Sequence, residues 1–118
     1  MAATERVICR SADLVDGGDG VRFEVPAPDG PAPAFAVRFG GRVCAYRNRC
    51  AHVPIELDWS PGRFFDYSGL YLICSMHGAH YAPESGRCVM GPCRGGRLTP
   101  VAVIERDGNL YLVGGENG

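Results

Sequence analysis

Two short segments place cysteine and histidine side chains at spacings that suit metal binding. One reads Cys50-Ala51-His52 and the other Cys74-Ser75-Met76-His77, so in each a cysteine precedes a histidine. Thiolates and imidazoles are the ligands of tetrahedral zinc sites, and of two-iron clusters in which two histidines replace two cysteines on one iron. Gly78 follows directly and lets the backbone bend closely around a bound group. The sequence therefore predicts a metal centre with four ligands: Cys50, His52, Cys74 and His77.

The order of the ligands bears on which metal they hold. Both segments run from cysteine to histidine, a repeat that a mononuclear zinc site does not require, since zinc ribbons usually begin with two cysteines two residues apart. A two-iron cluster uses the repeat directly, with both cysteines on the inner iron and both histidines on the outer one. The spacing favours iron–sulfur and leaves zinc open as the alternative.

The segments that must position these ligands are predicted to be strands and turns. Val21, Phe23 and Val25 alternate with polar residues, the period of a half-buried strand. Gly40-Gly41 and Asp107-Gly108 each separate two apolar runs, as in a hairpin. The stretch from Pro26 to Pro33 holds four prolines and is predicted to be a loop. The expected strands are 7–9, 21–25, 34–39, 42–47, 70–73, 79–82, 87–90, 101–106 and 109–113.

The 21 residues between His52 and Cys74 are rich in aromatic side chains. We expect a packed connector whose rings fill a small second core, in preference to an aromatic box for a ligand. The rings in this connector are Trp59, Phe64, Phe65, Tyr67 and Tyr71.

Composition excludes several classes of function. A chain of 118 residues is most simply one domain, and its net charge of −1 argues against nucleic-acid binding. No apolar run is long enough to span a membrane, and the first residues lack the layout of a secretory signal. We therefore expect a cytoplasmic protein whose six cysteines are metal ligands and spare thiols.

Longer stretches around the ligands resemble a Rieske [2Fe–2S] domain. They are Asn48 to His52, Cys74 to Tyr81, Ser85-Gly86 and Gly91-Pro92, and the small soluble Rieske-type ferredoxins are the most similar subgroup. The resemblance implies one [2Fe–2S] cluster and an all-β fold, an antiparallel β-sandwich with a small cluster-binding subdomain formed by two loops. Residues 1–118 would form a single domain with the subdomain at about 48–93, and Pro92 would belong to a loop that covers the cluster.

The resemblance also implies how the cluster is tuned. The hydroxyl of Tyr81 is expected to reach the sulfur of Cys50, as in high-potential members. Those members carry a serine where this chain has Ala79, and a disulfide where it has Ile55 and Ser75. Because the Tyr81 donor is present and both the serine and the disulfide are absent, the resemblance predicts a reduction potential in the low to middle part of the range of Rieske centres. The longer connector, Pro54 and Cys93 depart from the common pattern and bear on the partner surface.

The implied function is one-electron transfer from a reductase to a terminal oxygenase or related oxidoreductase. We expect redox partner proteins and no enzyme activity, nucleic acid, membrane or small-molecule substrate. The alternatives are a permanently bound small subunit of a larger oxidoreductase, and a redox-sensing module that uses the cluster or Cys88 and Cys93. His80 is expected to be an exposed strand residue. Arginines near the ligand loops would steer an acidic partner: Arg47, Arg49, Arg87, Arg94 and Arg97.

Overall fold

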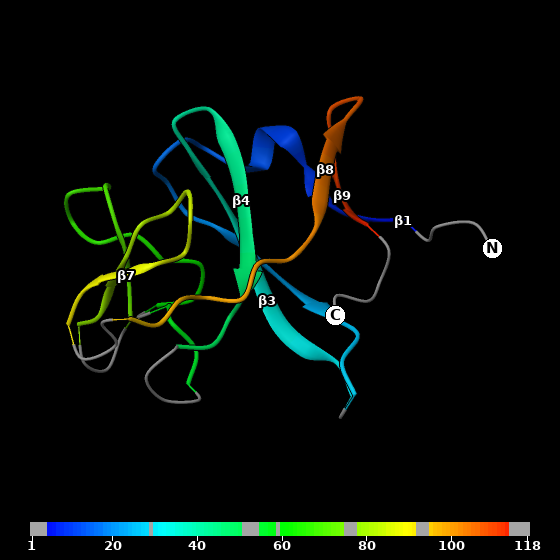
Figure 1. The fold of residues 1–118 in the computed structure, drawn as a ribbon. Helices are drawn as coiled ribbons and strands as arrows, with labels where there is room; N and C mark the ends of the chain where they lie inside the picture. The colour runs from blue at the N-terminus through cyan, green and yellow to red at the C-terminus, as the bar shows by residue number, and fades with distance from the viewer. Residues whose placement is uncertain are drawn as a thin grey trace.

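Three antiparallel sheets of three strands each account for nearly all the regular structure in the described residues (Figure 1). The computed structural model describes residues 5–28, 30–50, 55–58, 60–74, 78–91 and 95–113. The strand orders are β1-β9-β8, β2-β3-β4 and β5-β6-β7. This confirms the predicted all-β, antiparallel fold. The strands are β1 (Glu5–Arg10), β2 (Val21–Val25), β3 (Ala32–Phe39), β4 (Arg42–Arg47), β5 (Leu72–Ile73), β6 (His80–Tyr81), β7 (Cys88–Met90), β8 (Val103–Arg106) and β9 (Asn109–Val113).

The sheet β2-β3-β4 lies in the middle of the molecule, with the β8 and β9 hairpin on one side and β7 on the other (Figure 1). Its central strand β3 is buried on both faces. Successive side chains point to opposite sides of a strand, so the residues of β3 alternate between two cores. Ala34 and Ala36 belong to a base core shared with β9. Phe35 and Val37 belong to a site-side core shared with β5 and β6. The site-side core comprises Phe35, Val37, Tyr46, Cys50, Leu57, Phe64, Phe65, Leu72, Cys74, Ala79, Tyr81 and Leu98.

The turn between β3 and β4 is the predicted hairpin, and a side chain from outside the sheet completes it. Gly40 and Gly41 both have positive φ, +61° and +82°, the left-handed backbone that a two-residue hairpin turn requires. Their amides donate to the two carboxylate oxygens of Asp16 at 2.9 and 2.7 Å. The two glycines and Asp16 thus set the register of the strands that lead toward Cys50.

One difference from the expected strands is at Pro26 to Pro33, where β3 already begins at Ala32. Proline has no backbone N–H to donate within a strand, but the carbonyl of Pro33 still accepts a hydrogen bond from the backbone amide of Asn48 at 2.9 Å. In addition, β1 begins two residues earlier than expected, and β5 and β8 begin two residues later. Residues Ser11–Asp13 form a short 3-10 helix directly after β1. Among the described residues, no helix has the length and apolar character to cross a membrane.

Candidate metal centre

The two predicted sulfur ligands follow neighbouring segments of one core. Cys50 lies three residues after β4, and Cys74 directly follows β5. Both are almost fully buried, at 3% and 1% exposure, and both belong to the site-side core. The predicted ligands His52 and His77 lie outside the described residues. The structure therefore brings the two cysteines, 24 positions apart in the sequence, into the same buried region.

The first ligand loop is held closed by backbone and side-chain hydrogen bonds. The amide of Cys50 donates to the carbonyl of Ile55 at 2.8 Å. Asn48, which is 1% exposed, accepts the amide of Leu57 at 2.8 Å through its side-chain oxygen. Its amide group donates to Asp58 at 3.2 Å. Because a buried amide side chain must satisfy both its donor and its acceptor, Asn48 joins the two ends of this loop.

Asp58 connects the same loop to the central sheet. Its second carboxylate oxygen accepts the amide of Gly62 at 3.1 Å and lies 3.5 Å from the guanidinium of Arg22 on β2. Arg22 also pairs with the exposed Glu56 at 2.6 Å. The end of the loop after Cys50 is thus held by the connector and by β2.

Backbone hydrogen bonds join the two ends of the second ligand loop. The amide of Cys74 donates to the carbonyl of Ala79 at 2.8 Å, and the amide of Gly78 donates to the carbonyl of Cys74 at 3.2 Å. Gly78 has φ of +69°, a conformation that favours glycine. The predicted role of Gly78, a close bend of the backbone after the ligands, agrees with this geometry.

Tyr81 links the two ligand loops through its hydroxyl. The hydroxyl lies 3.2 Å from the Sγ atom of Cys50, and the ring is fully buried beside Leu72 in the β5-β6 pair. A phenol donates to a thiolate, so this contact stabilises negative charge on the Cys50 sulfur. Ala79 is also fully buried and presents a methyl group without a donor. The expected contact of Tyr81 with Cys50 is present.

Gly91, which directly follows β7, packs closely against Ala79 of the second ligand loop. A Cβ atom added to Gly91, which has φ of +100°, would lie 2.8 Å from the Cα atom of Ala79. Pro92 and Cys93, the next residues, lie outside the described residues. Cys88 is disulfide-bonded, whereas the sequence alone favours a thiol there because the compartment was expected to be reducing.

The remaining cysteines carry free thiols. Cys9 packs against the base core and Cys44 against the site-side core. Burial raises the pKa of both thiols, with smaller electrostatic contributions. Neutral, half-buried thiols are inert as nucleophiles and as metal ligands, so Cys9 and Cys44 are spare thiols that contribute to packing.

The aromatic connector is only partly the packed core that the sequence predicts. Phe64 stacks on Phe35 of β3 with ring centroids 4.0 Å apart, and Phe65 is buried against Phe39. Tyr67 is fully exposed, and Trp59 lies outside the described residues. The two phenylalanines therefore fasten the connector to the central sheet.

Sequence reasoning missed two groups of residues beside the ligand loops. Asn48 and Asp58 hold the first loop, and the only sequence signal was a polar residue two positions before Cys50. His80 was expected to be exposed, but only 20% of its side chain is accessible, because it packs between Asp66 and the Gly78 carbonyl. The signal for His80 was its place three residues after a ligand.

The arginines expected around the ligand loops are largely at the surface. Arg49, Arg87 and Arg97 are exposed, Arg47 is half-buried, and Arg94 lies outside the described residues. Arg87 and Arg97 face each other across an isolated antiparallel bridge. Like charges directly opposite each other repel, and the guanidinium of Arg97 donates to the carbonyl of Ser85 at 3.2 Å.

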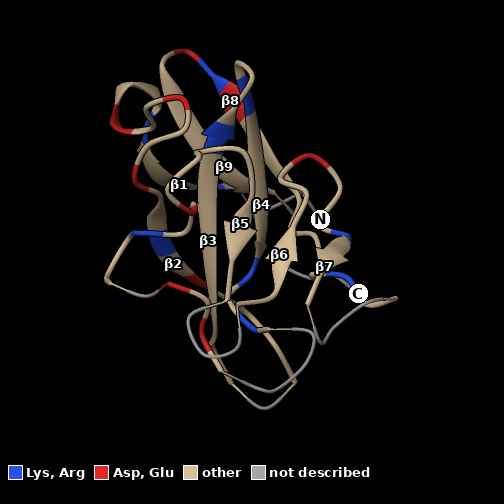
Figure 2. Ribbon diagram, turned by 90° about the vertical axis from the view of Figure 1, so that its left-hand side faces the viewer, with Lys and Arg blue, Asp and Glu red and all other residues tan. Residues whose placement is uncertain are grey.

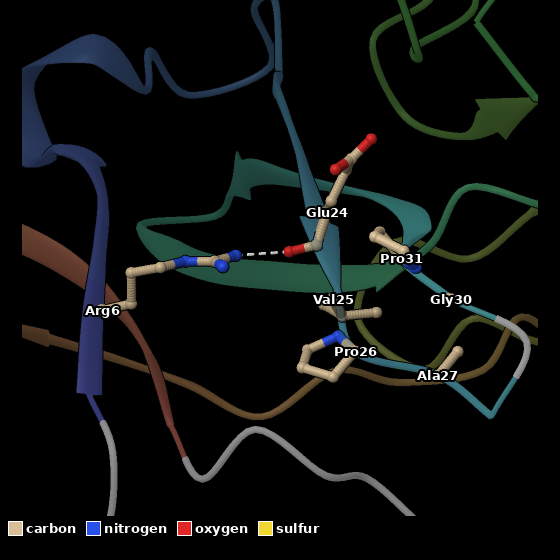
Figure 3. Close-up of a pocket in the computed structure, with 7 residues that line it drawn as sticks. All are labelled: Arg6, Glu24, Val25, Pro26, Ala27, Gly30 and Pro31. Carbon is tan, nitrogen blue, oxygen red and sulfur yellow. Dashed lines mark hydrogen bonds between the residues drawn. The ribbon is translucent and has the colours of Figure 1, made fainter.

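A cavity of about 300 Å³ lies elsewhere, beside β2 and the proline-rich loop (Figure 3). The guanidinium of Arg6 donates to the carbonyl of Glu24 across it. Neither Cys50 nor Cys74 lines this cavity, so it is separate from the candidate centre. Its lining residues are Arg6, Glu24, Val25, Pro26, Ala27, Gly30 and Pro31.

The described residues fit the sulfur half of an iron–sulfur centre. Cys50 and Cys74 lie in an apolar core, each follows a strand, and a buried hydroxyl faces one of the sulfurs. Iron–sulfur clusters are held by thiolates, and hydrogen bonds to sulfur tune them.

Comparison with known proteins identifies the family. Residues 4–112 match the Rieske [2Fe-2S] domain family. No curated protein sequence matches. The fold is similar to the ferredoxin of carbazole 1,9a-dioxygenase from Nocardioides aromaticivorans IC177, with a TM-score of 0.72 and 23% identity over 92% of this chain and 96% of that one. It is also similar to the terminal oxygenase of carbazole 1,9a-dioxygenase from Novosphingobium sp. KA1, with a TM-score of 0.75 and 21% identity over 97% of this chain.

The chain belongs to the Rieske [2Fe–2S] family, and its cofactor is one cluster of that type. It spans 29 to 31% of the length of the terminal oxygenase and oxygenase-complex chains it matches. A reduced complex between oxygenase and ferredoxin in carbazole 1,9a-dioxygenase is among these similar structures, with a TM-score of 0.75 and 15% identity.

Proposed function

We propose that this chain is a Rieske-type ferredoxin, a one-electron carrier between a reductase and a terminal oxygenase or related oxidoreductase. The observation that carries the proposal is the buried contact of Tyr81 with the Cys50 sulfur, in a core that also contains Cys74. The likeness to a ferredoxin over 92% of the chain supports the same function.

In this proposal Cys50 and Cys74 hold the inner iron, and His52 and His77 hold the outer one. Replacing two thiolates by two neutral imidazoles removes two negative charges, so Rieske centres accept an electron at about −150 to +300 mV, against about −400 mV for plant-type ferredoxins. The chain supplies the Tyr81 donor and no hydroxyl at Ala79, which favours the low to middle part of this span.

The rest of the chain would form a single domain that supports this centre. Residues of about 48–93 would make the cluster-binding subdomain, with the outer histidines toward the partner. The exposed Arg87 and Arg97 would then meet an acidic surface of the reductase or oxygenase.

Cysteine variants of anaerobically purified protein test the proposal. Wild-type protein should contain about two irons and two sulfides per chain. Cys50→Ala and Cys74→Ala should each lose both. Cys9→Ala, which changes a half-buried thiol packed against the base core, should retain them. Zinc without sulfide in the wild type, or equal iron in all four proteins, would refute the proposed centre.

A second experiment tests the direction of electron flow. The reduced protein, mixed with a terminal oxygenase of a Rieske system, should be oxidised in single turnovers, and a ferredoxin reductase should reduce it again. A protein that contains the cluster but exchanges electrons only as a fixed subunit of a larger complex would support the bound-subunit alternative.

The disulfide at Cys88 favours a redox-sensing module as a second candidate. Its reduction by a dithiol would consume two electrons and two protons and yield two thiols, while the dithiol becomes a disulfide. Thiol titration with and without a dithiol reductant, followed by voltammetry, tests this function. A potential that does not change on reduction of the disulfide would exclude sensing through it.

A further inference from the structure

His80 makes two contacts that connect the second ligand loop to the connector. Its Nδ1 atom lies 2.7 Å from the carbonyl oxygen of Gly78, and its Nε2 atom lies 3.4 Å from a carboxylate oxygen of Asp66. Only 20% of the His80 side chain and 16% of the Asp66 side chain are accessible to solvent. The edge of the imidazole also meets the ring of Tyr71, with centroids 6.0 Å apart.

The two ring nitrogens of His80 face different acceptors. A carbonyl oxygen accepts and cannot donate, so Nδ1 carries the proton that it donates to the carbonyl of Gly78. The other ring nitrogen, Nε2, lies 3.4 Å from the Asp66 carboxylate. The ring therefore bridges the second ligand loop and the connector.

Asp66 is itself held rigidly, so it orients the ring. Its other carboxylate oxygen accepts the Ser68 amide and hydroxyl at 3.1 and 2.7 Å and the Gly69 amide at 3.1 Å. Its backbone amide donates to Tyr71 at 2.9 Å. Burial alone would raise the pKa of Asp66, but the hydrogen bond from Ser68 and the charge of His80 bring the pKa below its usual value.

Gly78 lies at the end of the second ligand loop. Gly78 donates its amide to the carbonyl of Cys74, and the residue before it is the proposed ligand His77. On β6, His80 is paired with Ile73, whose amide donates to Phe64 in the connector at 2.9 Å. A shift of the His80 ring would therefore move the backbone that carries the ligands.

We propose that His80 is a positioning residue of the cluster, which ties the second ligand loop to Asp66 and raises the reduction potential. The inference rests on the proposed function, because it assumes a cluster at this loop. A hydrogen-bond donor that fixes the backbone beside the ligands stabilises the added electron.

Two substitutions at one position separate the hydrogen bond from ring packing. His80→Phe keeps an aromatic ring and removes both ring nitrogens. His80→Asn keeps an amide N–H near the Nδ1 position and loses the contact with Asp66. His80→Phe should lower electron affinity about three- to tenfold, which corresponds to about 30 to 59 mV for one electron. His80→Asn should lower the reduction potential by at most half as much as His80→Phe does.

Hydrogen exchange measures the same positioning without electron transfer. Peptides that cover 74–79 should exchange about tenfold faster in His80→Phe than in His80→Asn, while peptides of β3 and β4 stay unchanged. Absence of a cluster from wild-type protein would refute the proposed function, and exchange in 74–79 would still decide the role of His80. A folded His80→Phe protein with wild-type potential and exchange would overturn the inference, as would equal losses in both variants.

Discussion

The hydroxyl of Tyr81 lies where it bears directly on how readily the centre accepts an electron. It faces the Cys50 sulfur at 3.2 Å inside a core that excludes water. In such surroundings a hydrogen bond to a charged acceptor is stronger than in water. Ala79, on the neighbouring turn, is equally buried and offers no donor. The two positions give a matched pair for tests of sulfur hydrogen bonding.

Tyr81→Phe is expected to lower the reduction potential by about 65 to 130 mV. A hydrogen bond to a charged group contributes about 1.5 to 3 kcal/mol, and 59 mV corresponds to about 1.4 kcal/mol for one electron. Ala79→Ser should raise the potential if its hydroxyl reaches a sulfur. Protein-film voltammetry measures both shifts, with Tyr111→Phe on β9 as a control that should leave the potential unchanged. A wild-type potential in Tyr81→Phe would contradict the proposed sulfur ligand at Cys50.

At the scale of elements, a side-chain hydrogen-bond network fastens the first ligand loop to the sheets. Asn48 bonds to Leu57 and Asp58, and Asp58 in turn reaches Gly62 and Arg22. These contacts replace the regular ladder that a loop lacks. The loop is therefore held by a few buried polar groups, and the loss of one of them should destabilise the protein more than the loss of a surface contact.

Asn48→Ala is expected to destabilise the protein by about 2 to 4 kcal/mol. The substitution leaves the buried Leu57 amide without its acceptor and opens a small cavity. Urea denaturation measures the change, and transfer of iron to a chelator should become faster. Glu56→Gln, at an exposed ion pair in the same segment, should cost less than about 1 kcal/mol. Similar losses in the two variants would argue against a special role for Asn48.

At the scale of the whole molecule, Arg38 joins the central sheet to the sheet β1-β9-β8, here called the outer sheet. From β3 its guanidinium donates to the carbonyls of Leu14 and Ser11 at 2.9 and 3.2 Å, and it pairs with Glu105 of β8 at 2.7 Å. Figure 2 shows acidic and basic residues next to one another on β8. The hydrogen bond from Arg38 lowers the pKa of Glu105 below its usual value. This ion pair connects two sheets far apart in the sequence.

Glu105→Gln is expected to destabilise the protein by about 0.5 to 1 kcal/mol at pH 7, since the pair is partly exposed and screened. A carboxyl whose pKa is lowered by folding contributes stability above its unfolded-state pKa, near 4.3 for Glu, and loses it as the pH falls. The difference in the free energy of unfolding between variant and wild type should therefore decrease below about pH 4. Denaturation curves between about pH 3 and 7, on both sides of the ordinary Glu pKa, measure this difference, and a constant difference would contradict the ion pair.

The exposed pair Arg87 and Arg97 concerns the molecule as a partner for other proteins. Charge reversal at either arginine should slow electron exchange with an acidic partner about tenfold at low salt, because electrostatic attraction increases the rate of encounter. The effect should nearly vanish at 1 M salt, where the Debye length is about 3 Å. Stopped-flow mixing with a reductase measures the rates. Arg10→Glu on β1, in the outer sheet, is the control, and equal slowing by all three would place docking elsewhere.

Patterns local in the sequence predicted the elements of this fold well. The strands β2 and β9 have the predicted bounds, since alternating apolar residues and glycine-containing turns act over a few residues. The spacing of Cys50, His52, Cys74 and His77 pointed to a two-iron cluster for the same reason, and the family agrees with that cofactor. The start of β3 was missed because Pro33 contributes only its carbonyl.

Only the tertiary structure decided which residues support the centre. Asn48 meets residues 9 and 10 positions away, and His80 meets Asp66 across 14, so no local period reveals either contact. The exposure of Tyr67, the burial of Phe64 and the disulfide at Cys88 likewise depend on how the connector and β7 fold back. A sequence determines side-chain chemistry and local conformation, whereas buried polar pairs arise where chain segments distant in sequence are packed together, because burial then requires each donor to find an acceptor.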